Sequence, residues 1–133
     1  MITVLIQTES HFPVSRKKIT DSVQRALSGK IKSHAEVCIS IVGDRRMRHL
    51  NRQFRHIDET TDVLSFPLTD TSENSEYTLF VDPPDGILRL GDIVVSYPQA
   101  VDESAQNNVF VDDTIQTLVL HGLNHLLGIH HEE

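Results

Sequence analysis

Residues 121–133 read HGLNHLLGIHHEE, and this stretch carries the strongest structural pattern in the chain. His121 and His125 lie four positions apart, so on a helix they share one face. Gly128 offers an end for that helix, because glycine enters the left-handed conformation without a Cβ penalty. A turn there brings His131 back toward the first two histidines. The spacing therefore predicts a helix that ends near Gly128 and gathers three imidazoles.

Three converging imidazoles without thiolates describe an open zinc site, with one position left for water. Such a site suits catalysis better than a structural role. The alternative is that these histidines are half-buried, hydrogen-bonded side chains, which is the usual role of a single histidine on an apolar helix. Four of the eight histidines fall within residues 121–131, and this density favours a metal. We expect one Zn2+ per chain, although nickel, copper and iron also accept imidazole ligands.

Metzincin proteases carry the same histidine spacing in the pattern H-E-x-x-H-x-x-G-x-x-H. The histidines and Gly128 match it, but the second position is Gly122, where a peptidase needs a glutamate as general base. The residues therefore favour a zinc hydrolase over a peptidase. A metalloprotease-like hydrolase is kept as the disfavoured alternative.

Length and composition predict one domain, residues 1–133, that buries a core without disulfides. Cys38 is the single cysteine and lies in an alternating apolar stretch, so we expect a buried thiol in a reducing compartment. No segment has the ~20 apolar residues needed to cross a bilayer, and residues 1–7 lack the pattern of a signal peptide. These features predict a cytoplasmic protein with no membrane partner.

Charge is distributed unevenly along the chain. Residues 1–56 hold eleven of the twelve Lys and Arg against four acids, whereas residues 57–133 hold one arginine against fifteen acids. A solvated helix face explains most of the basic residues. Arginine is also the side chain suited to forked contacts with phosphate. The densest cluster has five arginines in eleven residues: Arg45, Arg46, Arg48, Arg52 and Arg55.

Hydrophobic periodicity predicts four strands and four helices. Met47, Leu50 and Phe54 mark the buried face of one helix, for which Asp44 is the expected N-cap. Residues 77–81 are expected to pair briefly. The expected strands are residues 2–7, 35–42, 63–66 and 90–96, and the expected helices cover about 16–28, 45–54, 98–107 and 112–127.

Three segments precede the histidine motif in a recognisable order. They are LNRQFR at residues 50–55, TDVLSFP at residues 61–67 and LGDIV at residues 90–94. Together with the histidines they resemble the YbeY family of bacterial zinc-dependent endoribonucleases, the rRNA maturation factors. The resemblance covers about residues 35–131. It implies an α/β (α+β-like) domain: a small, mostly mixed sheet of about four strands, packed with about four to five helices, one of them a metzincin-like zinc helix.

The resemblance also implies a site and a substrate. The family's three zinc ligands fall on His121, His125 and His131, and its arginine near the active site falls on Arg55. Arg55 and His121 are then the expected catalytic residues. Members of the family act on single-stranded RNA in 16S rRNA 3′-end maturation and ribosome quality control, so the expected partners are rRNA and the small ribosomal subunit. Three positions depart from the family pattern: Asn124 replaces leucine, Ile129 replaces tyrosine and His130 replaces aspartate.

The mechanism we expect is phosphodiester hydrolysis at a three-histidine zinc, with Arg55 on a phosphate of the RNA. The alternative for Arg55 is a helix-end salt bridge to Asp58 or Glu59. Residues 63–67 are expected to present an exposed strand edge along the site. The motif contains no evident general base, and attack by hydroxide or by the RNA 2′-OH stays open. Two other functions remain: a ribosome-associated RNA-binding module with a mainly structural zinc, and a hydrolase of small phosphoesters.

Overall fold

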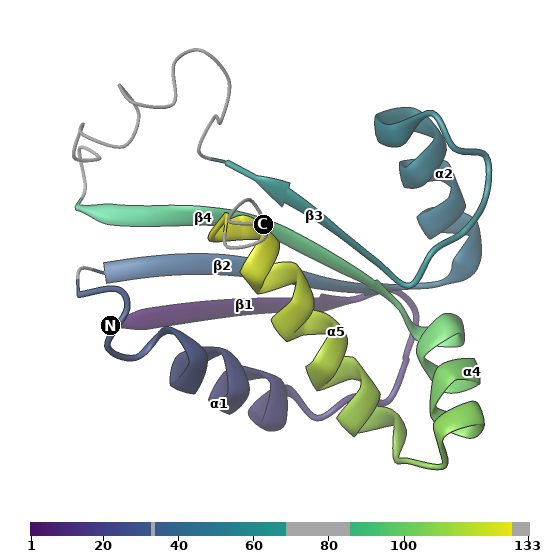
Figure 1. The fold of residues 1–133 in the computed structure, drawn as a ribbon, viewed down its shortest axis with the longest axis horizontal. Coiled ribbons are helices and arrows are strands. Elements are labelled where there is room, and N and C mark those ends of the chain that lie inside the picture. Colours follow the sequence, from purple (N-terminus) through teal and green to yellow (C-terminus); the bar gives the residue numbers. More distant parts are fainter. Residues whose placement is uncertain (33, 69–85, 129–133) are drawn as a thin grey trace.

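The computed structural model describes residues 1–32, 34–68 and 86–128 (Figure 1). The observed elements match the expected ones to within a few residues, and the brief pairing expected at residues 77–81 lies outside the described residues. Along the chain the elements are β1 (Ile2–Thr8), α1 (Arg16–Leu27), β2 (His34–Val42), α2 (Asp44–Arg55), β3 (Val63–Pro67), β4 (Ile87–Ser96), α4 (Tyr97–Asn107) and α5 (Val111–Leu126).

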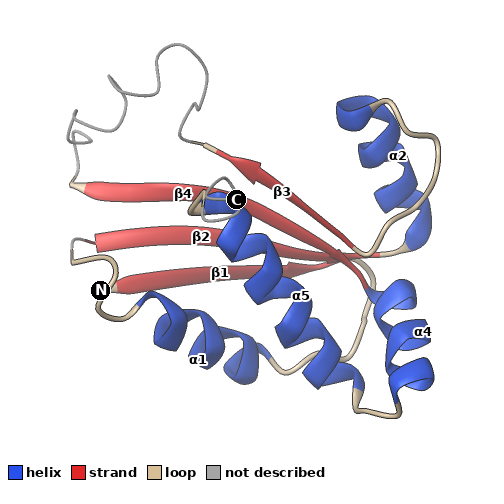
Figure 2. Cartoon of the chain, in the orientation of Figure 1, coloured by secondary structure: helices blue, strands red, loops and turns tan. Residues whose placement is uncertain are grey.

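The four strands form one mixed sheet in the order β1-β2-β4-β3 (Figure 2). β1, β2 and β4 run parallel, and β3 pairs antiparallel with β4 at the sheet edge. Parallel neighbours need a crossover between them, and α1 supplies the one between β1 and β2. The chain is thus a single α/β domain with a four-stranded mixed sheet and, among the described residues, four helices. This is the predicted fold class.

The main core lies between the sheet and two helices, α1 and α5, which cover one of its faces (Figure 1). Ile39 and Ile93, on the two central strands, are fully buried there. Val23 of α1 and Val119 of α5 meet them from the helix layer. Residues that alternate along a strand point to opposite faces, so the same strands also build a second, smaller core behind the sheet.

The second core lies between α2 and the edge of the sheet. Met47 is fully buried against Val94 and Leu64, which occupy paired positions on β4 and β3. Leu50 is partly buried beside them, as the periodicity predicts. Phe54 is different: 55% of it is exposed, so its assignment to the buried face was wrong. It lies in the last turn of α2, beyond the small apolar cluster that anchors the helix.

Asp44 occupies the first turn of α2 rather than its N-cap, which is Gly43. Its carboxylate does not cap a backbone N–H, because it accepts hydrogen bonds from three other side chains. These are Thr60 Oγ1 at 3.0 Å, Ser96 Oγ at 2.8 Å and Gln99 Nε2 at 3.2 Å. Asp44 therefore ties the start of α2 to the loop before β3 and to the β4–α4 junction. The N-cap prediction missed this by one residue.

Cys38 is only partly buried, which corrects the expectation of a buried thiol. It lies on β2 with its side chain on the face opposite the main core. Partial burial, together with the charges of Asp92 and Glu36, raises the pKa of the thiol. No helix in the described ranges is both long enough and apolar enough to cross a bilayer.

Candidate active site

Two of the predicted ligands project side by side from α5. His121 is exposed and His125 is half-buried, and their ring centroids lie 4.5 Å apart. The opposite face of the helix fixes their position, because Ile115, Val119 and Leu123 are buried in the main core. The apolar face of α5 thus sets the direction in which both imidazoles point.

Gly122 lies between the two histidines and packs directly on β4. A Cβ atom at this position would lie 2.8 Å from Ile93 Cγ2, and Ile93 is fully buried. A side chain here would therefore push α5 away from the sheet. The close approach explains in physical terms why this chain carries glycine where a metzincin carries its catalytic glutamate. It weakens the metalloprotease alternative further.

Helix α5 ends where the glycine pattern predicted. Leu127 is the C-cap, and Gly128 follows with a φ of +75°. The Gly128 N–H donates to the His125 carbonyl at 3.0 Å, and the Leu127 N–H donates to the Leu123 carbonyl at 3.0 Å. These bonds satisfy carbonyls at the end of the helix. His131, the third predicted ligand, and its neighbour His130 lie outside the described residues.

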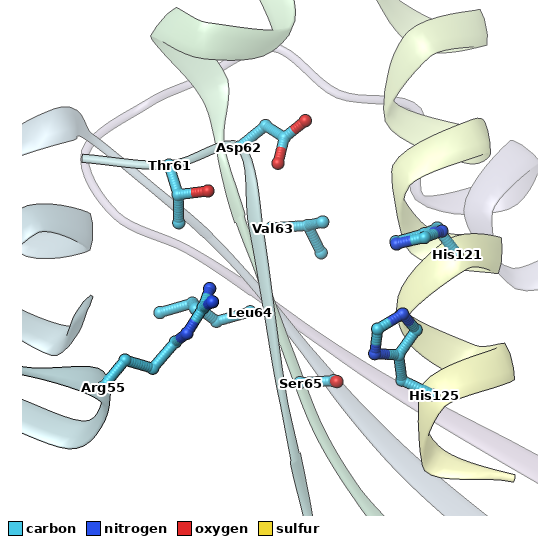
Figure 3. Close-up of a pocket in the computed structure, with 9 residues that line it drawn as sticks. Arg55, Thr61, Asp62, Val63, Leu64, Ser65, His121 and His125 are labelled. Carbon is cyan, nitrogen blue, oxygen red and sulfur yellow. The ribbon is translucent and has the colours of Figure 1, made fainter. Parts of the chain in front are cut away.

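The histidines face a cleft of about 420 Å³ that wraps around the edge strand β3. The cleft is lined by Arg55, Thr61, Asp62, Val63, Leu64, Ser65, His121, Gly122 and His125. Figure 3 shows His121 and His125 projecting from α5 toward β3, with Arg55 approaching β3 from the α2 side. Strand β3 therefore lines the cleft, as expected for residues 63–67. The structure also brings Arg55 into the same cleft as the two histidines.

Arg55 is the last residue of α2, and His56 turns the chain away with a φ of +62°. Among the described residues no carboxylate forms an ion pair with Arg55. Asp58, the expected alternative partner, binds Arg48 through two hydrogen bonds of 2.8 and 3.1 Å. This pairing lowers the pKa of Asp58 and raises that of Arg48. The guanidinium of Arg55 thus remains available to a ligand in the cleft.

Sequence reasoning missed an acidic pair at one end of the cleft. Asp62 lines the cleft, and its side chain hydrogen-bonds to Glu103 of α4. Burial, then this hydrogen bond and the charge of Asp62, raise the pKa of Glu103 to about 7. One of the two carboxyls must hold a proton to form the bond. The TDVLSFP segment of the sequence pointed to Asp62. Nothing in the sequence of residues 97–107 pointed to a contact between Glu103 and the cleft.

The described residues supply two of the donors that a zinc ion would need. No group of three His, Cys, Asp or Glu side chains that could hold a metal occurs in the described ranges. The two imidazoles line the same cleft, with ring centroids 4.5 Å apart. This separation allows one zinc ion to bind a nitrogen of each ring at about 2.0–2.1 Å. Neutral imidazoles also suit zinc chemically. The pair therefore fits two corners of a zinc site, with His131 as the predicted third.

Known proteins resemble this chain along most of its length. The family profile of endoribonuclease YbeY matches residues 5–133. An endoribonuclease YbeY from Dehalococcoides mccartyi is 37% identical over 121 residues, covering 88% of this chain and 68% of the relative. One from Chloroflexus aggregans is 34% identical over 131 residues, covering 98% and 82%. The solution structure of TM1509 from Thermotoga maritima shares the fold, with a TM-score of 0.60 at 23% identity over 93% of this chain and 71% of that one. The chain belongs to the endoribonuclease YbeY family.

Proposed function

We propose that this protein is a zinc-dependent endoribonuclease that cuts single-stranded RNA in the cleft around β3. One observation carries the proposal: an arginine without a carboxylate partner among the described residues shares a cleft with two helical histidines. Family membership supports the reaction class, since the relatives are named as endoribonucleases. A cation-binding corner and an arginine in one open cleft suit a phosphodiester, which carries negative charge at the reacting centre.

Each side chain has a separate task in this proposal. His121, His125 and His131 hold the zinc ion. When bound there, zinc supplies Lewis-acid activation of water and of the phosphoryl group. The Arg55 guanidinium donates to phosphate oxygens and stabilises the charge that develops on them. The negative charge that Asp62 and Glu103 share repels phosphate from the end of the cleft that Asp62 lines, which directs the RNA backbone toward Arg55.

The cellular substrate we propose is rRNA on the small ribosomal subunit, in 16S rRNA 3′-end maturation and ribosome quality control. The family resemblance supports this role. An edge strand beside the cleft also suits an extended single strand, because among the described strands β3 has a sheet neighbour, β4, on one side only. Work on the ribosome would place the protein in the cytoplasm.

The test of the activity is cleavage of an end-labelled single-stranded RNA by purified, zinc-loaded protein. Arg55→Ala is expected to lower the cleavage rate roughly 100- to 1,000-fold, the range seen when one donor to a developing oxyanion is removed. Its zinc content and unfolding midpoint should match wild type. Arg25→Ala, an exposed arginine on α1, is the matched control and should cleave normally. Wild-type cleavage by Arg55→Ala would remove Arg55 from the mechanism.

The ligand assignment has its own test, read as zinc per chain. His125→Ala and His131→Ala are expected to lose stoichiometric zinc, whereas His130→Ala should retain it. His11→Ala, an exposed histidine far from the motif in sequence, serves as the control for losing an imidazole. If His130→Ala loses the metal and His131→Ala keeps it, His130 is the third ligand.

A further inference from the structure

Helix α2 carries a straight row of exposed arginines that leads to the cleft. Arg45, Arg48, Arg52 and Arg55 are separated by three, four and three positions, so they lie on one face of the helix. All four are exposed. We name these four residues the arginine stripe. Ten residues of helix extend about 15 Å, so the stripe runs outward from Arg55 along the length of α2.

The stripe has one carboxylate neighbour among the described residues that line its surface. A shallow depression of about 260 Å³ lies along it, lined by Arg45, Arg48, His49, Arg52 and Asp58. Both carboxylate oxygens of Asp58 accept hydrogen bonds from Arg48. No ion pair in the described part of the chain involves Arg45 or Arg52. In a chain with a formal net charge of −7, this is a local cationic surface.

An exposed aromatic side chain stands at the cleft end of the same helix. Phe54 is 55% exposed and makes an edge contact with Phe66 of β3, with ring centroids 5.1 Å apart. Phe66 therefore supports one edge of the Phe54 ring. Phe54 directly precedes Arg55, the cleft end of the stripe, and projects from a different side of α2 than the stripe does. Aromatic side chains that stack on bases, combined with cations that contact phosphates, are the means by which proteins bind single-stranded nucleic acid.

We infer that the arginine stripe and Phe54 form a binding track for the single-stranded RNA that flanks the cut site. Arg45 and Arg52 contact backbone phosphates outside the cleft, and one base stacks on Phe54. This inference rests on the proposed endoribonuclease function and extends it to the substrate beyond the reacting phosphate. The contacts carry little sequence information, because phosphate and stacking contacts tolerate any base.

The test is equilibrium binding of a fluorescein-labelled single-stranded RNA to zinc-loaded protein, followed by anisotropy across a salt series. The strand is checked on a gel after each titration, and cleavage is measured on the same RNA. Arg45→Ala/Arg52→Ala is expected to bind roughly tenfold more weakly. Its plot of log affinity against log salt should be shallower by about 1.4, since each phosphate contact on a single strand contributes about 0.7. Cleavage at RNA concentrations below saturation should fall by a similar factor, because less RNA is bound.

Arg25→Ala/Lys30→Ala removes the same charge from an exposed region around the end of α1 and is the matched control. It should keep both the affinity and the salt slope of wild type. Phe54→Ala should bind roughly tenfold more weakly with an unchanged slope, in the range measured for loss of one stacked base. Phe54→Tyr should restore the affinity. Unfolding midpoints of all variants are measured in parallel.

Three results are decisive. Weaker binding and a shallower slope in the stripe variant alone support the track. Wild-type affinity and slope in the stripe variant, with active wild-type enzyme, overturn the track and leave the endoribonuclease proposal standing. Wild-type protein that neither binds nor cuts RNA at low salt overturns both.

Discussion

The two helices beside the cleft, α5 and α2, are built in opposite ways. Seven of the sixteen residues of α5 are buried, whereas two of the twelve residues of α2 are buried. Helix α5 is held by the main core and presents its histidines from a fixed position. Helix α2 is anchored by Met47 and Asn51, and its exposed surface carries the arginine stripe. Helix α5 therefore positions the proposed chemistry, and helix α2 supplies positive charge. Substitutions in α5 should therefore affect folding, and substitutions in α2 should affect RNA binding.

The largest expected effect comes from truncating a buried side chain of α5 in the main core. Leu123 is 1% exposed, so Leu123→Ala should lower the free energy of unfolding by about 2–5 kcal/mol, from lost burial and the cavity left behind. Phe54→Ala on α2 should cost about 1 kcal/mol or less, because that ring is largely exposed. Urea denaturation measures both. Equal costs for the two variants would contradict the contrast between the helices.

A smaller loss is expected from adding one methyl group at Gly122. The new Cβ would lie 2.8 Å from Ile93 Cγ2, so Gly122→Ala should destabilise the fold by about 1–3 kcal/mol through overpacking. Asn124→Ala, at an exposed position on the same helix, is the control and should be near neutral. Stability at or above wild type in Gly122→Ala would mean that α5 can shift away from the sheet at no cost.

The acidic pair beside the cleft predicts a pH dependence of stability. The pKa of Glu103 is raised from 4.5 to about 7, so the folded state binds more protons than the unfolded state between these values. The stabilising contribution is complete below about pH 4.5 and is lost as the pH rises through about 7. Glu103→Gln should remove this part of the pH profile and be more stable than wild type at pH 8. A wild-type profile in Glu103→Gln would rule out the shared proton.

The smallest expected effect belongs to the ion pair on the surface of α2. Arg48 and Asp58 are both largely exposed, so water and salt screen their attraction. Arg48→Ala should leave the urea midpoint indistinguishable from wild type at physiological salt. A double-mutant cycle with Asp58→Ala measures the coupling directly. A large coupling would show that this pair, rather than Met47 and Asn51, anchors α2.

The sequence predicted what depends on local periodicity and failed where distant segments meet. The strands, the helices and the turn at Gly128 follow from alternation, helical spacing and glycine chemistry. The exposure of Phe54 could not be read from spacing, because it depends on how far the second core extends under α2. The local pattern predicts Asp44 as an N-cap, but its carboxylate binds Ser96 and Gln99 instead. These bonds join segments far apart in the chain, so no local pattern could predict them. The Asp62–Glu103 contact has the same origin.

The candidate site was predictable in part for the same reason. His121 and His125 are neighbours on one helix, so their spacing alone placed them together. The presence of Arg55 in their cleft depends on how α2 and β3 pack, and the family resemblance, rather than any local pattern, pointed to it. The roles of these residues and of His131 remain predictions.

Zinc dependence of the proposed cleavage is tested by a zinc titration of RNA cleavage, starting from protein stripped of metal with a chelator. Metal-free protein should show no cleavage at first, and activity should then rise and saturate at one zinc per chain. His125→Ala should stay inactive throughout the titration. Full cleavage by metal-free wild-type protein, or normal zinc-dependent activity in His125→Ala, would contradict a catalytic zinc held by these histidines.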